Sequence, residues 1–399
     1  MEAGKDMKLV FYSVVLNQHQ APVADELWEL TGHQYAFVEL TNLSDTKGGT
    51  EDYSKRPYLI RAWENQDSFQ QAMNLAKHAD CCVFSGVDAL PFQKERMRLG
   101  LLSFDMGERW LKHGIKSLAS PRLVKWLMAY YLGGWRHKPL YKLCCSAFCA
   151  KDHYALGTFK DKCYKWGYFT KVDTSGCETN VETSTDVSTS GIAPLMWCSR
   201  YLMLKHPELP ILMAERLKKK GYKFRLDMYG SGECEEASKK IAESLKLMDV
   251  VKFHGAVPND QVHEAMRISE IFLFTSDRYE GWGAVANESL SEGCVLVASD
   301  AIGSSPYLIK EGVNGFMFHS SNASCSYGNP DELALESLCE KVEWLLEHPT
   351  ERKQMRQNAQ RVMQEMWSPV NAAKSLLQLI DDLKNEKDSY VLDGPCCKA

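Results

Sequence analysis

Two glutamates lie eight positions apart in the segment SDRYEGWGAVANESLSEG, which spans residues 276–293. Two glycines and a tryptophan separate Glu280 from a helix-forming stretch that contains Glu288. Each carboxylate offers two acceptor oxygens that suit the paired hydroxyls of a sugar or a ribose. Glycine lets the backbone approach a ligand closely, and the unpaired N–H groups that open a helix can receive an anion. The segment therefore predicts a site for a sugar joined to phosphate.

A carboxylate next to a phosphate requires nearby cations, because two anions repel each other at short range. The candidates are Arg200 and Lys205, in the stretch WCSRYLMLKHPEL. Either residue alone would be read as an ordinary solvated charge. We interpret them as part of a site because the segments that carry them and the two glutamates lie at the carboxyl ends of predicted strands.

The second half of the chain alternates short apolar runs with longer segments of helical period, which is typical of a parallel sheet covered by helices. Strands are predicted at residues 194–201, 223–230, 250–255, 270–276 and 294–300. Helices are predicted at 207–220, 234–246, 260–267 and 284–292, and only helices after residue 330. Open parallel sheets bind ligands at the carboxyl ends of their strands, where Glu280 is placed by this pattern.

The first half shows the same alternation and predicts a second sheet. Its strands are expected at residues 8–14, 35–40, 57–62, 81–86, 101–106 and 142–148, and two of its helices at 66–78 and 121–132. Residues 174–190 are rich in Ser and Thr and predict an exposed linker. We therefore expect a first domain at residues 1–173 and a second at 191–366.

The C-terminal segment, residues 367–399, is expected to begin a last helix at Ser368-Pro369 and to cross back to the first domain. Serine is a good N-cap, and proline is tolerated at the first helical position. The tail ends in CCKA, which departs from the pattern of a prenylation site, so we expect an ordinary frayed terminus.

With these parts together, the chain resembles the retaining glycosyltransferases of family 4, two-domain enzymes that use nucleotide-activated sugars. The resemblance covers residues 194–318. It rests on the cations at the end of the first strand of this half and on motifs that follow its next four strands, which are YGSGE, FHGAVP, TSDRYEGWGAVANES and SDAIGSSPYLI. It implies an α/β chain with the GT-B fold, two Rossmann-like doubly wound domains facing a central cleft. NQHQAP, FDMGERW and KCYKWGYF in the first domain resemble a bacterial capsular-polysaccharide branch.

The resemblance also implies residue roles. Arg200 and Lys205 would neutralise the diphosphate, Glu288 would hold the ribose, and Glu280 would hold the donor sugar. The other implied donor-binding residues are Gly281, Trp282, Gly283, Ala284, Val285, Gly230, Gly255, Gly303 and Ser304. The chain lacks the Asp-x-Asp pair with which other glycosyltransferases hold a metal, so we expect no metal and no cofactor besides the donor substrate.

Three residues of the first half are further candidates. Asp105 and Glu108 lie near a predicted strand end, where a carboxylate could accept a proton from an attacking sugar hydroxyl. The alternative for Glu108 is a structural ion pair with the neighbours of Arg109. His19, in the loop after the first strand, could contact the donor diphosphate or make only a structural hydrogen bond.

Residues 109–142 contain eight Lys and Arg with no acidic residue, interleaved with Trp and Tyr. Such a stretch suits an anionic membrane surface, and a core helix with a solvated basic face is the alternative. A nucleic-acid groove would need aromatic residues for base stacking without the apolar run LVKWLMAYYL, so no nucleic-acid partner is expected.

Composition fits a two-domain protein, since 399 residues with 45% hydrophobic content exceed one ordinary core. The 14 cysteines include no C-x-x-C pair and predict reduced, buried thiols. We therefore expect a cytoplasmic protein that is either soluble or bound peripherally to the inner face of the membrane. The resulting hypothesis is a retaining, metal-independent glycosyltransferase that acts on a glycan or lipid-linked glycan in surface polysaccharide biosynthesis. The alternatives are a non-catalytic nucleotide-sugar scaffold or sensor, or a phosphorylase or epimerase on the same fold.

Overall fold

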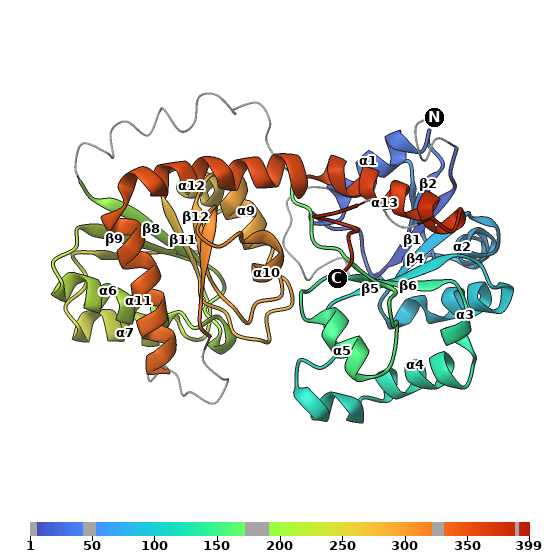
Figure 1. Ribbon diagram of the computed structural model, residues 1–399, viewed down its shortest axis with the longest axis horizontal. Helices are drawn as coiled ribbons and strands as arrows, with labels where there is room; N and C mark the ends of the chain where they lie inside the picture. The colour runs from blue at the N-terminus through green and yellow to red at the C-terminus, as the bar shows by residue number, and fades with distance from the viewer. Residues whose placement is uncertain (1–5, 43–52, 172–190, 321–330, 388–390) are drawn as a thin grey trace. The chain divides into compact units, whose positions relative to one another are not determined.

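The computed structural model describes residues 6–42, 53–171, 191–320, 331–387 and 391–399. The chain divides into two compact units (Figure 1). The first unit comprises Met1–Lys171 and Met366–Ala399, and the second comprises Val172–Glu365. The predicted Ser/Thr-rich linker lies outside the described residues.

The first unit is built on a seven-stranded parallel sheet with the order β3-β2-β1-β4-β5-β6-β7. Its strands are β1 Leu9–Ser13, β2 Tyr35–Glu39, β3 Leu59–Arg61, β4 Cys81–Ser85, β5 Ser103–Gly107, β6 Leu140–Cys144 and β7 Cys163–Lys165. All five residues of β1 are buried, as expected for a central parallel strand that is covered on both faces.

Helices cover both faces of this sheet. They are α1 Ala21–Leu30, α2 Gln66–His78, α3 Leu90–Leu99, α4 Pro121–Tyr131, α5 Cys149–Ala155 and α13 Pro369–Lys384, with a 3₁₀ turn η2 at Gly114–Ala119. Figure 1 shows α1 and α13 side by side on one face and α2 with α3 on the other. The helix predicted at residues 66–78 is confirmed at both ends by α2.

The second unit holds a six-stranded parallel sheet with the order β10-β9-β8-β11-β12-β13. Its strands are β8 Ala193–Cys198, β9 Phe224–Tyr229, β10 Val251–Gly255, β11 Ile271–Phe274, β12 Val295–Ser299 and β13 Gly315–Phe318. Its helices are α6 Glu208–Lys219, α7 Glu235–Ser244, α8 Asn259–Ile268, α9 Val285–Ser291, α10 Ser305–Leu308, α11 Glu332–Glu347 and α12 Pro349–Arg361. The predicted doubly wound α/β class is confirmed.

Two parts of the element prediction were wrong or incomplete. Strand β6 covers 140–144 and not 142–148, because the run CCSAF leaves the sheet and turns into α5, where the Cys149 N–H donates to the Ser146 carbonyl at 3.0 Å. Strands β7 and β13 were not predicted, since their three and four residues are too few to show a period.

The last helix begins as the sequence predicts. The Ser368 hydroxyl accepts a hydrogen bond from the Asn371 N–H at 3.2 Å, and Pro369 occupies the first helical position. Helix α13 belongs to the first unit and packs on α1. No helix in the described ranges is long and apolar enough to span a membrane.

The frayed terminus predicted for the CCKA tail is wrong. The Cys396 N–H donates to the Lys165 carbonyl at 2.7 Å, and the Lys165 N–H donates to the Cys397 carbonyl at 2.8 Å. Both cysteines are buried. The tail therefore pairs with β7 and satisfies the exposed backbone groups of an edge strand.

A buried ion pair joins β5 and β6. Lys142 is completely buried, and its ammonium contacts the Asp105 carboxylate of the neighbouring strand at 2.5 Å. Burial alone would lower the pKa of Lys142, but the attraction of Asp105 raises it above its usual value. The lysine is therefore charged inside the sheet and depends on its partner.

We predict that Lys142→Met lowers the free energy of unfolding by about 3 to 5 kcal/mol, because Asp105 is left with an unpaired buried charge. The double variant Lys142→Met with Asp105→Leu removes both charges and recovers most of that loss. Denaturant unfolding followed by circular dichroism measures both. Equal destabilisation in the single and double variants would show that the pairing itself contributes little.

Candidate donor site

The ammonium of Lys205 contacts the carboxylate of Glu280, although the two residues are 75 positions apart. Lys205 ends a 3₁₀ turn at Met203–Lys205 that follows β8, and Glu280 lies in the loop that follows β11. The neighbouring position of these strands explains the contact, because β8 and β11 pair in parallel and their carboxyl ends meet at one edge. The structure thus brings together two of the residues that the sequence singled out.

A buried hydrogen-bond chain fixes the two loops that carry this pair. The Trp197 indole N–H donates to the Thr275 hydroxyl at 2.9 Å, and that hydroxyl donates to the Lys205 carbonyl at 2.7 Å. The Asp277 N–H donates to the Leu204 carbonyl at 2.9 Å. The backbone around Lys205 is therefore held against the strand end of β11.

Close packing requires glycine at two of the predicted donor positions. Gly283 has φ +78°, and a side-chain Cβ there would lie 2.2 Å from the Phe274 ring and 3.3 Å from Cγ of Glu280. Gly230, after β9, has φ +118°, and a Cβ would lie 1.9 Å from the Ser199 carbonyl oxygen. Both backbones approach their neighbours too closely for any other residue. Gly255, after β10, has φ +69° with open space around it.

The side chain of Trp282 does not face a ligand. It is completely buried, and its indole N–H donates to Asn287 at 2.8 Å. The buried hydroxyl of Ser304 donates to the Trp282 carbonyl at 2.6 Å, which ties the Gly303-Ser304 turn to the Gly281–Val285 loop. The side chains of Trp282 and Ser304 therefore support the loop from the protein interior.

Arg200 lies two residues beyond β8 and is exposed. Within the described part of the chain, its guanidinium forms no ion pair and no hydrogen bond. It therefore contributes a positive charge that forms no ion pair with a carboxylate of the described residues. Such a group is suited to receive an anion.

Glu288 is half-buried in the first turn of α9. Burial raises its pKa, while His263 on α8 opposes that rise. Burial and the nearby charge of Glu288 also raise the pKa of Cys198, at the end of β8, to about 12. Glu288 is thus near enough to Cys198 to influence its pKa, and its role in binding a ribose stays a prediction.

Sequence reasoning missed a charged cluster behind the Lys205 turn. His206 has φ +47°, and its Nδ1 lies 2.9 Å from Glu208 while its Nε2 lies 3.4 Å from Asp277. Burial alone would lower the pKa of His206, but the two carboxylates raise it to about 9. The spacing of His206 and Glu208 was visible, but Asp277 joins them only through the fold.

In the first unit, Tyr168 connects two of the predicted residues. Its hydroxyl donates to Glu108 at 2.8 Å, and its ring stacks on His19 with centroids 5.7 Å apart. Lys112 contacts the other oxygen of Glu108 at 2.5 Å, so the structural ion pair that the sequence left open is present. Tyr168 itself was not singled out, because nothing local links it to a residue 60 positions away.

The expected position of Asp105 needs correction. It lies inside β5, with one oxygen on Lys142 at 2.5 Å and the other 3.3 Å from the Gln93 amide. Both oxygens are thus engaged within the sheet. This arrangement favours a structural role over that of a proton acceptor.

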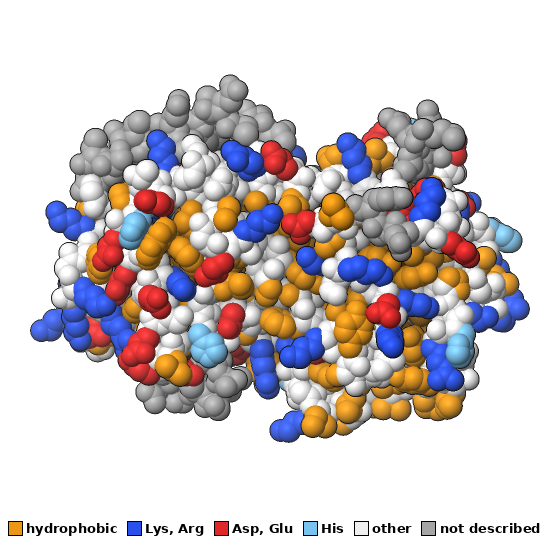
Figure 2. All heavy atoms as spheres, in the orientation of Figure 1, with side chains coloured by type: hydrophobic (Ala, Val, Ile, Leu, Met, Phe, Trp, Pro, Cys, Tyr) orange, Lys and Arg blue, Asp and Glu red, His pale blue; other side chains and the backbone are white. Residues whose placement is uncertain are grey.

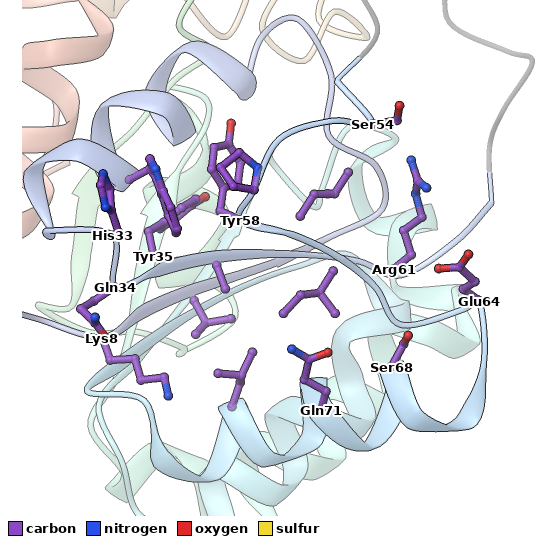
Figure 3. Close-up of a pocket in the computed structure, with 17 residues that line it drawn as sticks. Lys8, His33, Gln34, Tyr35, Ser54, Tyr58, Arg61, Glu64, Ser68 and Gln71 are labelled. Atoms are coloured by element: carbon purple, nitrogen blue, oxygen red, sulfur yellow. The ribbon is translucent and has the colours of Figure 1, made fainter.

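A separate cavity of about 420 Å³ lies at the β2–β3 edge of the first unit (Figure 3). Figure 3 shows Lys8, Gln34 and Tyr35, which precede or begin β1 and β2, among its lining residues. None of the predicted site residues lines it. The cavity extends to the amino ends of strands, whereas the predicted donor residues lie at carboxyl ends in the other unit.

No cluster of three or more metal-binding side chains occurs among the residues that the structure describes. The expectation that no metal is used is not tested by this finding. The charges beyond the strand ends of the second unit include Arg200, the Lys205–Glu280 pair and the cluster of His206, Glu208 and Asp277.

Solved structures of the same shape define the class of fold. HepE of Anabaena in complex with UDP superimposes with a TM-score of 0.66 at 13% identity, covering 94% of this chain and 100% of that one. A glycosyltransferase from Rickettsia africae gives a TM-score of 0.64 at 15% identity, covering 96% and 99%. The chain has the two-domain GT-B fold.

The family comparison concerns the second unit. Residues 196–362, within this unit, match the family described as Glycosyl transferases group 1. A D-inositol 3-phosphate glycosyltransferase of Streptomyces griseus is 34% identical over 89 residues, which are 22% of this chain and 18% of the relative. A poly(glycerol-phosphate) alpha-glucosyltransferase of Bacillus subtilis is 31% identical over 100 residues, or 25% and 14%. The matches thus span less than a fifth of these two relatives.

The His206 cluster gives a prediction about pH. The pKa of His206 in the folded protein lies above its usual value of 6.5. The stabilisation that protonated His206 contributes is therefore fully present below about pH 6.5 and is lost as the pH rises through about 9. Between pH 6 and 9.5, we expect the second unit to lose on the order of 3 kcal/mol of unfolding free energy from this group. Denaturant titrations at the two pH values measure the loss.

The variant His206→Gln should show a smaller loss between the two pH values. His319→Gln, which changes an exposed histidine of the same unit, serves as the matched control and should behave like the wild type. An identical pH dependence in wild type and His206→Gln would contradict the assignment.

Proposed function

We propose that the protein is a glycosyltransferase that moves a sugar from a nucleotide-diphosphate sugar to a glycan or lipid-linked glycan, with retention at the anomeric carbon. The second unit would bind the donor, and the first unit would bind the acceptor. The proposed setting is cytoplasmic biosynthesis of surface polysaccharide such as a capsule. The described cysteines are free thiols, which fits a reducing compartment.

The observation that carries this proposal is the contact between Lys205 and Glu280 beyond the carboxyl ends of two paired parallel strands, with Arg200 two residues beyond β8 and Glu288 in the first turn of the helix that follows β11. This edge belongs to the domain that matches Glycosyl transferases group 1. Open α/β sheets bind nucleotides at such an edge. The charges there suit a ligand that combines a diphosphate with vicinal hydroxyls, since cations and carboxylate acceptors lie side by side.

The proposed roles follow from exposure and contact. Arg200 is exposed and unpaired within the described residues, so it would bind the diphosphate first. Lys205 is mostly buried, and its contact with Glu280 would be shared with a diphosphate oxygen once the donor arrives. Glu280 would keep hydrogen bonds to hydroxyls of the donor sugar, and Glu288 would bind the ribose.

In the reaction that we propose, the bond between the anomeric carbon and the diphosphate oxygen breaks. The acceptor hydroxyl forms its new bond on the same face, and its proton passes to the departing diphosphate. Negative charge grows on the leaving oxygen, so fixed cations at Arg200 and Lys205 lower the barrier. This route uses protein charges alone and does not require a metal.

The relatives support this class of chemistry. HepE has been solved with UDP and with UDP-glucose, which are nucleotide ligands of the proposed type. The curated relatives are named for transfer to inositol phosphate and to poly(glycerol-phosphate). Both acceptors carry hydroxyl groups beside phosphate, and the acceptor of this chain is proposed to be of that kind or a lipid-linked glycan.

We predict that Arg200→Ala lowers kcat by about 10² to 10³, because one fixed donor to the leaving oxygen is lost. Arg200→Lys should retain more activity, since it keeps the charge without the paired N–H groups. Transfer of radiolabelled sugar measures this, after a panel of nucleotide sugars has been screened by thermal stabilisation. Arg361→Ala, an exposed arginine on α12, is the matched control and should retain full activity.

Two outcomes would count against the proposal in different ways. Full transfer activity in Arg200→Ala would remove this residue from the reaction. Binding of a nucleotide sugar without any turnover on lipid-linked acceptors would instead favour a scaffold or sensor. Release of free sugar phosphate, or an isomerised donor, would indicate a phosphorylase or an epimerase.

A further inference from the structure

A row of large apolar side chains is exposed on the outer side of η2 and α4 in the first unit. We call it the outer face and define it by Ile115, Leu118, Val124, Met128 and Leu132. Leu132 is 81% exposed, Met128 is 55% and Val124 is 44%. These three residues lie at i, i+4 and i+8, so they occupy one side of α4. Ile115, at 84%, extends the face onto η2.

The opposite side of α4 is already used by the protein core. Trp126 and Tyr130 are buried and stack on each other, and Trp135 packs against Trp126. The aromatic residues that the sequence assigned to a membrane are therefore mostly core residues, which corrects part of that expectation. The helix is apolar on two sides, and core packing explains only one of them.

The charges around the outer face have one sign. Lys116, Arg122, Lys125 and Arg136 are exposed, and the sequence from 109 to 142 holds no acidic residue. Three other cations of this stretch point inward to the ion pairs Arg109–Asp152, Lys112–Glu108 and Lys142–Asp105. Among the residues that the structure describes, no carboxylate forms an ion pair with Lys116, Arg122 or Lys125.

Figure 2 shows the resulting surface along the lower edge of the first unit. Hydrophobic side chains gather there over α4 and η2, and Lys and Arg lie beside them. Scattered exposed apolar residues are ordinary on soluble proteins, but a contiguous group marks an interaction site. Aliphatic side chains flanked by cations match the interfacial region of an anionic lipid bilayer.

We propose that the outer face docks onto a membrane that contains anionic phospholipid. The aliphatic side chains enter the headgroup boundary, and the four exposed cations contact lipid phosphates. This assignment does not depend on the reaction that the second unit carries out.

Two other occupants fit the outer face less well. A second copy of the chain, meeting the face about a two-fold axis, would bring like charges together. A single-stranded nucleic acid would need exposed aromatic rings for base stacking, whereas the outer face is aliphatic and Trp126, Tyr130 and Trp135 are buried.

The test is co-sedimentation of the full chain with vesicles of phosphatidylcholine alone, or with about 30% phosphatidylserine, an anionic lipid of the kind that attracts basic segments. We expect binding to the anionic vesicles that weakens as salt increases, and little binding to the neutral ones. Two variants separate the contributions. Met128→Ser with Leu132→Ser removes apolar contact, and Lys116→Gln with Arg122→Gln and Lys125→Gln removes charge.

Each variant should lower the partition coefficient about tenfold or more, since every basic residue near the surface and every inserted apolar side chain adds to binding. Matched controls in the second unit are Met248→Ser with Ile268→Ser, and Lys240→Gln with Lys252→Gln and Lys353→Gln, all at exposed positions. The controls should bind like the wild type. Circular dichroism melting checks that all variants are folded.

Three results would overturn the proposal. The first is the absence of binding to anionic vesicles, and the second is unchanged binding in both outer-face variants. The third is a concentration-dependent dimer in gel filtration that disappears in Met128→Ser with Leu132→Ser, which would assign the outer face to self-association.

Discussion

The ion pair between Lys205 and Glu280 is the interaction on which the proposed donor site depends. It joins the turn after β8 to the loop after β11. The hydrogen bonds from Trp197 to Thr275 and from Thr275 to the Lys205 carbonyl hold the same two segments together. Both side chains are mostly buried, so neither charge is fully compensated by water. Each residue therefore needs its partner until a ligand replaces one of the contacts.

This constraint explains how carboxylates and a diphosphate can share one sheet edge. In the free protein Lys205 neutralises Glu280, and Arg200 adds an exposed positive charge. Burial raises the pKa of Glu288. The charged His206 cluster behind the turn holds the backbone that presents Lys205. The glycines at 230 and 283 let these loops pack closely enough for the charges to meet.

The sequence predicted the parts of the fold that depend on local pattern. Buried strands such as β1 and β12 are continuous apolar runs, and the Ser368-Pro369 start of α13 is a local capping signal. The prediction failed where a distant contact decides the outcome. The CCKA tail is held by backbone hydrogen bonds to β7, and the Asp105 carboxylate is engaged within the sheet by Lys142 of the neighbouring strand.

The same division holds for the candidate sites. Arg200, Lys205, Glu280 and Glu288 could be selected because the segments that carry them lie at the carboxyl ends of predicted strands, and parallel sheets gather such positions at one edge. Tyr168 and Asp277 could not be selected, because their partners His19, Glu108 and His206 are distant in the sequence. On α4, a helical period marked an apolar helix but could not tell the buried aromatic side from the exposed aliphatic side.

The most direct test of this account is a calorimetric titration of Glu280→Gln with a nucleoside diphosphate. The ligand is whichever of UDP, GDP or ADP most stabilises the wild-type protein. The substitution leaves Lys205 without its carboxylate partner and removes the repulsion between Glu280 and the diphosphate. We therefore predict that the variant binds the nucleoside diphosphate about tenfold more tightly than the wild type does. Unchanged or weaker binding in Glu280→Gln would show that Lys205 and Glu280 do not surround the diphosphate.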